Sequence, residues 1–310
     1  MQQSEDSTNN LIIKLINSAE GLISKIETLL FTNDIKPNWN SLAWRWVSQK
    51  NKGFLQAIKN PQQVDLKLIQ FVDIQKAEIV RNTRQFLNNL PANNVLLTGA
   101  RGTGKSTLIK GLLAEFASQG LRMIEVDKHD LVDVNEVVWL INNRPEKFII
   151  FCDDLTFEEN DSSYKALKVA LDGSLEAMSN NVLVYATSNR KNLMPEFMAD
   201  NLPKSISSDE IRPNDTIEEK TALAERFGLW LSFYGYDQDE YLAICASWLQ
   251  TYGFIFDQNA RQAALSFTHS RGARNGRVAY QFARDYVGKL GLDNLGLDNL
   301  GLANLASQKI

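Results

Sequence analysis

Residues 99–106 carry the spacing that most clearly suggests chemistry: glycine, four free positions, glycine, lysine and serine. Glycines let a backbone adopt positive φ and approach an anion closely, so that successive N–H groups form a nest for phosphate oxygens. In such a loop Lys105 reaches the β- and γ-phosphates, and the hydroxyl of Ser106 binds Mg²⁺. The pattern therefore predicts a nucleoside triphosphate site. Its predicted binding residues are Gly99, Ala100, Arg101, Gly102, Thr103, Gly104, Lys105, Ser106 and Thr107.

The segments on both sides of this loop have the periodicity that the motif requires. Residues 94–98 form a short apolar run typical of a strand, and residues 107–116 have apolar side chains at helical spacing. A helix that begins at the loop points the positive end of its dipole at bound phosphates. We therefore expect a strand, a phosphate-binding loop and a helix in that order, rather than a plain glycine-rich turn.

A second group of candidate side chains, Asp153 and Asp154, follows directly after another apolar run at residues 148–152. Asp153 is predicted to hold Mg²⁺ together with Ser106. A carboxylate beside the γ-phosphate can accept a proton as water attacks in line, so Asp154 is predicted to be the base or polariser. The alternative is a strand followed by an ordinary turn.

The next apolar run, residues 182–186, ends in small polar residues that include Asn189. Because this run follows the acidic one, Asn189 is predicted to orient the attacking water or to contact the γ-phosphate. The alternative is an asparagine that caps the following turn. The predicted catalytic residues from sequence position are thus Lys105, Asp154 and Asn189.

Composition limits the class of protein. The chain has 310 residues, 44% of them hydrophobic and 23% charged, which suits one or two globular domains. A formal net charge of -4 does not indicate a general polyanion binder but leaves room for a local basic patch. Cys152 and Cys245 lie in apolar segments, so we expect two buried thiols in a reducing, cytoplasmic setting rather than a disulfide. Neither a signal peptide nor a membrane span is predicted.

Apolar periodicity also predicts the elements that position these residues. Strands are expected at residues 94–98, 121–126, 147–152, 181–186 and 229–233, and helices at 10–31, 75–88, 107–116, 131–142, 162–177, 217–227, 237–252, 257–267 and 274–290. Alternating strands and helices indicate a parallel α/β sheet. Residues 192–215 are predicted to be a long loop or broken helix. Trp39, Trp44 and Trp46 are interpreted as a small hydrophobic core, with a docking surface as the alternative.

Four parts are predicted along the chain. They are a helical N-terminal accessory region at residues 1–62, a nucleotide-binding α/β core at 63–235, a helical lid at 236–290 and a flexible tail of pentapeptide-like repeats at 291–310. Three repeat units are too few to form a stable solenoid alone.

The two nucleotide motifs, Asn189, an Arg-Phe-Gly motif at residues 226–228 and the three helices after it together resemble the AAA+ superfamily of P-loop ATPases. The resemblance spans about residues 64–290. Within it, residues 94–106, 124–128, 151–155, 163–168, 185–190 and 237–242 are similar to the bacterial ATPase family known as domain of unknown function eight hundred and fifteen. The resemblance implies a three-layer α/β/α core with a parallel sheet, an all-helical C-terminal lid, and ATP with Mg²⁺ as ligands.

The resemblance also implies roles for three arginines. Arg226 is similar to the arginine with which replication-initiator ATPases reach the ATP of a neighbouring subunit, which would make it a fourth catalytic residue. Arg277, and after it Arg274, is similar to the second arginine sensor of the lid, including that of Holliday-junction motors. Arginine suits these roles because its rigid fork grips phosphate oxygens at two places and stays charged. The alternative for each is a solvated surface arginine.

One departure from the common AAA+ pattern is the pair Asp153-Asp154, where most members carry Asp-Glu. The shorter side chain of Asp154 implies slow hydrolysis or dependence on a neighbour. Replication initiators and helicase loaders also carry Asp-Asp, so the departure favours a nucleotide-switched assembly.

The leading hypothesis is an ATP hydrolase that works as a homo-oligomer, a ring or a filament, on an unknown macromolecular target, protein or nucleic acid, with no membrane partner. The alternative is an ATP-switched binding module or loader with little hydrolysis, motivated by the accessory region. A GTPase is disfavoured because the sequence lacks an Asn-Lys-x-Asp motif. A small-molecule kinase stays open, since Asp154 could activate an acceptor hydroxyl.

Overall fold

The computed structural model describes residues 20, 36–49, 52–157, 162–172, 180–189, 223 and 225–294. The chain divides into two compact units, Met1–Asn38 and Trp39–Ile310, and every element below belongs to the second. The predicted helix at residues 10–31, apart from Glu20, lies outside the described residues. So do the predicted loop at 192–215 and most of the predicted helix at 217–227.

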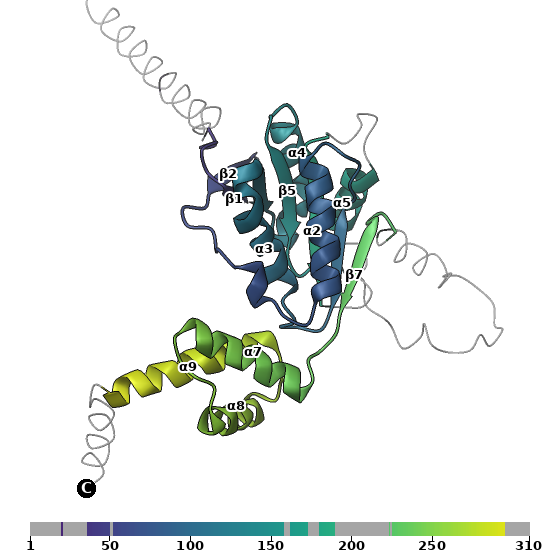
Figure 1. Ribbon diagram of the computed structural model, residues 1–310. Helices are drawn as coiled ribbons and strands as arrows, with labels where there is room; N and C mark the ends of the chain where they lie inside the picture. The colour runs from purple at the N-terminus through teal and green to yellow at the C-terminus, as the bar shows by residue number, and fades with distance from the viewer. Residues whose placement is uncertain are drawn as a thin grey trace, which may run out of the picture. The chain divides into compact units, whose positions relative to one another are not determined.

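A sheet of seven strands runs through the second unit in the order β2-β1-β4-β5-β6-β3-β7 (Figure 1). Its strands are β1 (Ala43–Gln49), β2 (Lys52–Ala57), β3 (Val95–Gly99), β4 (Leu121–Glu125), β5 (Lys147–Cys152), β6 (Val182–Ser188) and β7 (Leu229–Phe233). Only β1 and β2 pair antiparallel among the described neighbours, and the other pairs are parallel. The predicted parallel sheet is confirmed.

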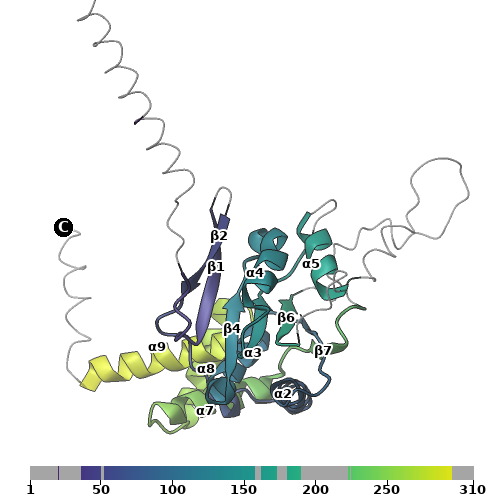
Figure 2. The ribbon, with the colours of Figure 1, turned by 90° about the horizontal axis from the view of Figure 1, so that it is seen from above.

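Helices cover both faces of this sheet. The helical segments of the core are η1 (Leu66–Leu68), α2 (Asp73–Leu87), α3 (Lys105–Phe116), η2 (Ala117–Gln119), η3 (Lys128–Asp133), α4 (Val134–Ile141) and α5 (Ser162–Asp172). One face packs on α2 and α3, and the other packs on η3, α4 and α5 (Figure 2). The three predicted layers are therefore present.

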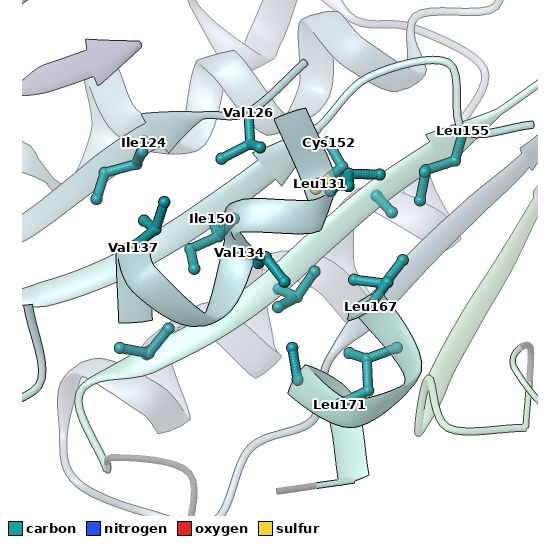
Figure 3. Packing of buried hydrophobic residues seen from close by; sticks show 14 of the residues in the cluster. Ile124, Val126, Leu131, Val134, Val137, Ile150, Cys152, Leu155, Leu167 and Leu171 are labelled. Carbon is teal, nitrogen blue, oxygen red and sulfur yellow. The ribbon is translucent and has the colours of Figure 1, made fainter. Parts of the chain in front are cut away.

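The alternation of side chains along β5 explains why its sequence is apolar throughout. Ile149 and Phe151 join the core under α2 and α3, whereas Phe148 and Ile150 join the core on the opposite face. A strand covered on both faces needs apolar residues at every position. Figure 3 shows the core between the sheet and the segments η3, α4 and α5. There Ile124, Val126, Ile150 and Cys152 from the sheet side meet Leu131, Val134, Val137, Leu167 and Leu171 from η3, α4 and α5.

The beginning of β3 is held by a side chain from α2. The amide of Asn82 donates to the carbonyl of Asn93 at 2.8 Å and accepts from its N–H at 3.0 Å, which is the exchange that a neighbouring strand would make. The same amide group donates to the hydroxyl of buried Tyr185 on β6 at 3.0 Å. The strand that leads to the glycine-rich loop is therefore anchored where it enters the sheet.

Three helices follow β7 within the described residues: α7 (Gln238–Thr251), α8 (Gln258–Arg271) and α9 (Gly276–Asn294). They enclose a core of their own that includes Tyr241, Leu249 and Phe282. A capping box begins α7, in which Asp237 and Glu240 each accept the other's backbone N–H, at 2.8 and 2.9 Å. The predicted lid helices are confirmed, and α9 continues through Asn294 into the predicted tail, whose other residues lie outside the described ones.

Residues 36–49 and 52–62, which belong to the predicted helical accessory region, contain no helix. The strands β1 and β2 form a hairpin there, and β1 pairs with β4, so that Trp44 lies beside Ile124. Trp44 and Trp46 are buried, and Trp39 packs against Trp44 with ring centroids 5.6 Å apart. Trp39 and Trp44 also pack against Phe148, with ring centroids 6.4 and 6.2 Å apart. Burial of these large aromatic side chains outweighs helix formation, because it removes extensive apolar surface from water. The interpretation of the tryptophans as core is correct, and the helical prediction is wrong for this stretch.

Both cysteines are free and buried, as predicted. Burial raises the pKa of the Cys152 thiol to about 12, so this group beside Asp153 stays protonated and unreactive. None of the helices in the described residues is both long and apolar enough to cross a bilayer.

The aromatic core of the hairpin gives a stability prediction. Trp44→Ala removes a side chain that is 0% exposed and is expected to lower the free energy of unfolding by about 3–5 kcal/mol. The matched control is Trp139→Ala on α4, where the ring is 74% exposed and the change should stay within about 0.5 kcal/mol. Denaturant unfolding measures both, and equal losses would contradict the assignment of Trp44 to the core.

Candidate nucleotide-binding site

The glycine-rich loop connects β3 to α3 in the conformation that its sequence requires. Gly99, Gly102 and Gly104 have φ of 126°, 78° and 93°, in the left-handed region that disfavours residues with a Cβ. A Cβ at Gly99 would also lie 1.9 Å from the carbonyl oxygen of Phe233 on β7. Glycine is therefore needed here for backbone angle and for close strand approach together.

Lys105, the first residue of α3, is the central cation of the site. Its Nζ donates to the carbonyl oxygens of Gly99 at 2.8 Å and Ala100 at 2.7 Å, and to Oδ1 of Asn189 at 3.1 Å. The side chain is buried, and burial lowers the pKa of Lys105, while the charges of Asp154 and Asp153 oppose that shift. An ammonium group has three N–H donors, and here each has an oxygen partner.

Asp153 and Ser106 meet although they come from different elements. Ser106 lies on α3, and Asp153 is the first residue after β5. Ser106 Oγ donates to Asp153 Oδ1 at 2.5 Å. A hydroxyl and a carboxylate are hard oxygen ligands, and Mg²⁺ typically takes one or two carboxylates and completes its shell with water and substrate phosphates. No group of three or more His, Cys, Asp or Glu side chains suited to an all-protein metal cage occurs among the described residues. The pair thus fits Mg²⁺ bound together with phosphate.

Asp154 and Asn189 also contact each other. Asn189 Nδ2 donates to Asp154 Oδ1 at 2.6 Å, while its own Oδ1 accepts from Lys105. Asp154 has φ of 53°, one of the few non-glycine residues with left-handed backbone among those described. The amide of Asn189 therefore bridges Asp154, the predicted base, and Lys105, the predicted phosphate-binding lysine.

These residues line one cavity of about 770 Å³, a size typical of small-molecule sites. Its walls include Arg101, Gly102, Gly104, Lys105, Ser106, Thr107, Asp153, Asp154, Thr187, Asn189 and Arg277. Residues 62–65 and 68–70 add to it, as do three aromatic side chains from the chain after β7: Trp248 on α7, Tyr252 directly after α7, and Tyr280 on α9. Of the remaining loop residues, Thr103 is buried and its hydroxyl donates to Ala100 at 2.9 Å.

The three predicted arginines lie at different places. Arg277, near the start of α9, lines the cavity and is exposed, whereas Arg274 is exposed but does not line it. Arg226 lies in the turn before β7, where its N–H donates to the carbonyl of Leu223 at 3.2 Å, and it is not among the lining residues. Of the two lid arginines, Arg277 is thus the one that reaches the cavity, and the roles of all three arginines stay predictions.

Sequence reasoning missed two kinds of contact. Tyr236 donates its hydroxyl to the carbonyl of Thr103 at 2.8 Å, and the N–H of Gly276 donates to the carbonyl of Gly102 at 2.9 Å, so the chain after β7 is bonded to the loop itself. Thr187 contacts both acidic residues. Only a polar residue at the end of an apolar run hinted at Thr187, and nothing in the sequence singled out Tyr236.

The strand order, the loop between β3 and α3 and the helical lid define an AAA+ P-loop NTPase fold. Residues 39–290 match the family described as "Protein of unknown function (DUF815)". The chain belongs to this family, as its sequence predicts. No curated protein sequence matches the chain.

Solved structures with a similar arrangement include two of Thermotoga maritima RuvB. The Holliday junction branch migration motor has a TM-score of 0.47 at 15% identity, covering 74% of this chain and 66% of that one. A point mutant of RuvB has a TM-score of 0.49 at 14% identity, covering 73% and 65%. The Aeropyrum pernix ORC1 protein in complex with DNA has a TM-score of 0.46 at 13% identity, covering 68% and 57%. The chain spans less than two thirds of the length of each.

The loop geometry gives a second prediction. Gly99→Ala is expected to weaken ATP binding and to destabilise the protein, because it adds a clash with β7 to the strain of positive φ. Gly120→Ala is the matched control, since Gly120 has φ of 93° with nothing within 4 Å of a built Cβ. The control should lose only the strain of about 1–3 kcal/mol. Thermal unfolding and titration with a fluorescent ATP analogue compare the two, and equal effects would contradict the close approach at Gly99.

Proposed function

We propose that this protein is a magnesium-dependent ATPase that uses ATP turnover to change its own conformation within a homo-oligomer. The observation that carries the proposal is the convergence of Lys105, Ser106, Asp153, Asp154 and Asn189 on one cavity beside a left-handed glycine loop. A phosphate-binding loop without the acidic pair would suit nucleotide binding but not hydrolysis. The acidic pair adds a ligand for Mg²⁺ and a base for water.

Binding of ATP begins with an exchange of partners at Lys105. All of its N–H donors contact protein oxygens, so contact with the β- and γ-phosphates requires at least one of these bonds to be replaced. The bond to Asn189 is the longest of the three, at 3.1 Å, and is the one we expect to yield. Freed from Lys105, the amide of Asn189 can turn toward the γ-phosphate and the water that attacks it.

Ser106 and Asp153 would hold Mg²⁺, directly or through water. When bound, Mg²⁺ neutralises charge that develops on the phosphate oxygens. Asp154 lies at the cavity wall and would accept the proton of the attacking water, with Asn189 orienting that water from the adjacent strand end. Positioning and charge are the main contributions that a protein makes to phosphoryl transfer, and these four side chains supply both.

The assembly part of the proposal rests on arginines. Arg226 does not line the cavity of its own chain, and an arginine outside its own site is suited to complete the site of a neighbouring copy. Arg277, with Arg274 near it, would follow the nucleotide from the lid. Release of phosphate would then move α7–α9 relative to the sheet and act on a macromolecular target, protein or nucleic acid.

The proposed chemistry predicts a split between two variants. Lys105→Ala should abolish ATP binding and turnover, because the only predicted phosphate-binding cation of α3 is lost. Asp154→Asn should keep ATP binding but lower turnover by about 10²–10⁴-fold, the usual contribution of a general base. Phosphate release and binding of an ATP analogue are measured for both variants. The control is Lys289→Ala, which changes an exposed lysine of α9 that is not among the cavity-lining residues. Unchanged turnover in both variants would refute the proposal, and binding without turnover in the wild type would favour the ATP-switched binding module.

A shared site makes a further prediction about mixed assemblies. Arg226→Ala alone and Asp154→Asn alone should each have strongly reduced turnover. In the wild type, turnover per subunit should rise with protein concentration. A mixture of the two variants should regain part of the turnover, because an Arg226→Ala subunit offers an intact Asp154 and its Asp154→Asn neighbour offers an intact Arg226. Phosphate release from the mixture, compared with each variant alone, is the measurement. No recovery in an assembly shown by light scattering would contradict a role for Arg226 in trans.

A further inference from the structure

We propose that Thr187 is a positioning residue of this site, whose hydroxyl sets Asp153 and Asp154 in their working places. The inference rests on the proposed ATPase function and assigns a role to a side chain that is not among the predicted site residues. Thr187 lies near the end of β6, directly beside the end of β5, where Cys152 pairs with Ala186.

The hydroxyl of Thr187 acts both as a hydrogen-bond donor and as an acceptor. Oγ1 donates to Asp153 Oδ1 at 2.6 Å and accepts from the N–H of Asp154 at 2.9 Å. The carbonyl of Thr187 accepts from the N–H of Leu155 at 2.7 Å. One residue therefore bonds to each of the three residues that follow β5.

For Asp153, the bond to Thr187 fixes the direction of the carboxylate. Oδ1 accepts from Ser106 on α3 and from Thr187 on β6, so it is held from two elements at once. Hydrogen bonds to an ionised carboxylate are among the stronger ones, and burial of Thr187 at 2% exposure keeps water from competing. The carboxylate thus stays aligned with Ser106, its partner in holding Mg²⁺, before the ion arrives.

For Asp154, the bond to Thr187 supports an unfavourable backbone angle. A φ of 53° is uncommon for a residue with a Cβ and persists where neighbouring groups fix it. The N–H of Asp154 is held by Thr187 and its carboxylate by Asn189, at 2.9 and 2.6 Å. The turn that presents Asp154 to the cavity therefore depends on a hydroxyl at position 187.

Two substitutions separate the hydroxyl from the shape of the side chain. Thr187→Val keeps the volume and branching but removes both hydrogen bonds, and Thr187→Ser keeps the hydroxyl. The matched control is Thr83→Val on α2, where an equally buried hydroxyl donates to the carbonyl of Ile79 at 2.8 Å and contacts the Tyr185 hydroxyl at 3.0 Å. Thr83 does not line the cavity, so this control reports the cost of losing a buried hydroxyl alone.

The test measures affinity for a fluorescent ATP analogue with EDTA and across a Mg²⁺ titration, together with turnover and thermal unfolding. Thr187→Val should raise the Mg²⁺ concentration for half-maximal enhancement of binding by about 10–100-fold, as loss of a group that orients a metal ligand typically does. It should lower kcat more than it changes KM, and should leave affinity in EDTA unchanged. Thr187→Ser should restore the wild-type Mg²⁺ dependence, and Thr83→Val should lose stability without altering that dependence.

Either of two results would overturn the inference: a wild-type Mg²⁺ dependence in Thr187→Val, or the same change in Thr83→Val. A wild-type protein whose affinity responds to Mg²⁺ but which shows no turnover would refute the ATPase proposal, and the binding titration would still decide the role of Thr187. A wild-type affinity that is the same with and without Mg²⁺ would overturn both.

Discussion

The buried ammonium group of Lys105 must have oxygen partners, because a buried charge without them is strongly destabilising. The carbonyls of Gly99 and Ala100 turn toward Nζ to supply two of them, and that turn needs the positive φ of the glycines. The third comes from Asn189, at the end of a different strand. The carbonyl directions of the loop and the position of Asn189 at the end of β6 together accommodate one cation.

The parallel sheet explains how residues far apart in sequence serve the same cavity. The carboxyl ends of parallel strands meet at one edge, where ligands bind in open α/β sheets. Here β5, β6 and β3 are neighbours in that order, so the acidic pair, Asn189 and the glycine loop arrive side by side. The number of residues between these groups in the sequence does not indicate how far apart they lie in space, because it depends on the lengths of the helices and loops between the strands.

Much of the fold could be predicted where apolar runs had clear ends. The bounds of β5 and β7 agree with the predicted ones, and the loop, the acidic pair and the lid helices were expected from local patterns. The hairpin of β1 and β2 was not, since Trp44 and Trp46 are fixed by a partner strand, β4, that is distant in sequence. Thr187 was missed for the same reason: its importance comes from strand pairing, which no local pattern records.

The anchorage of β3 by Asn82 has a mechanical consequence. The start of β3 is hydrogen-bonded to α2, and its last residue, Gly99, packs closely against β7. Because it is held at both ends, we expect β3 to resist displacement along its axis. We expect a shift of the glycine loop on nucleotide binding to leave this strand in place. Tyr236 and Gly276 donate to loop carbonyls, so such a shift would reach the helices after β7 through these two hydrogen bonds rather than through the sheet.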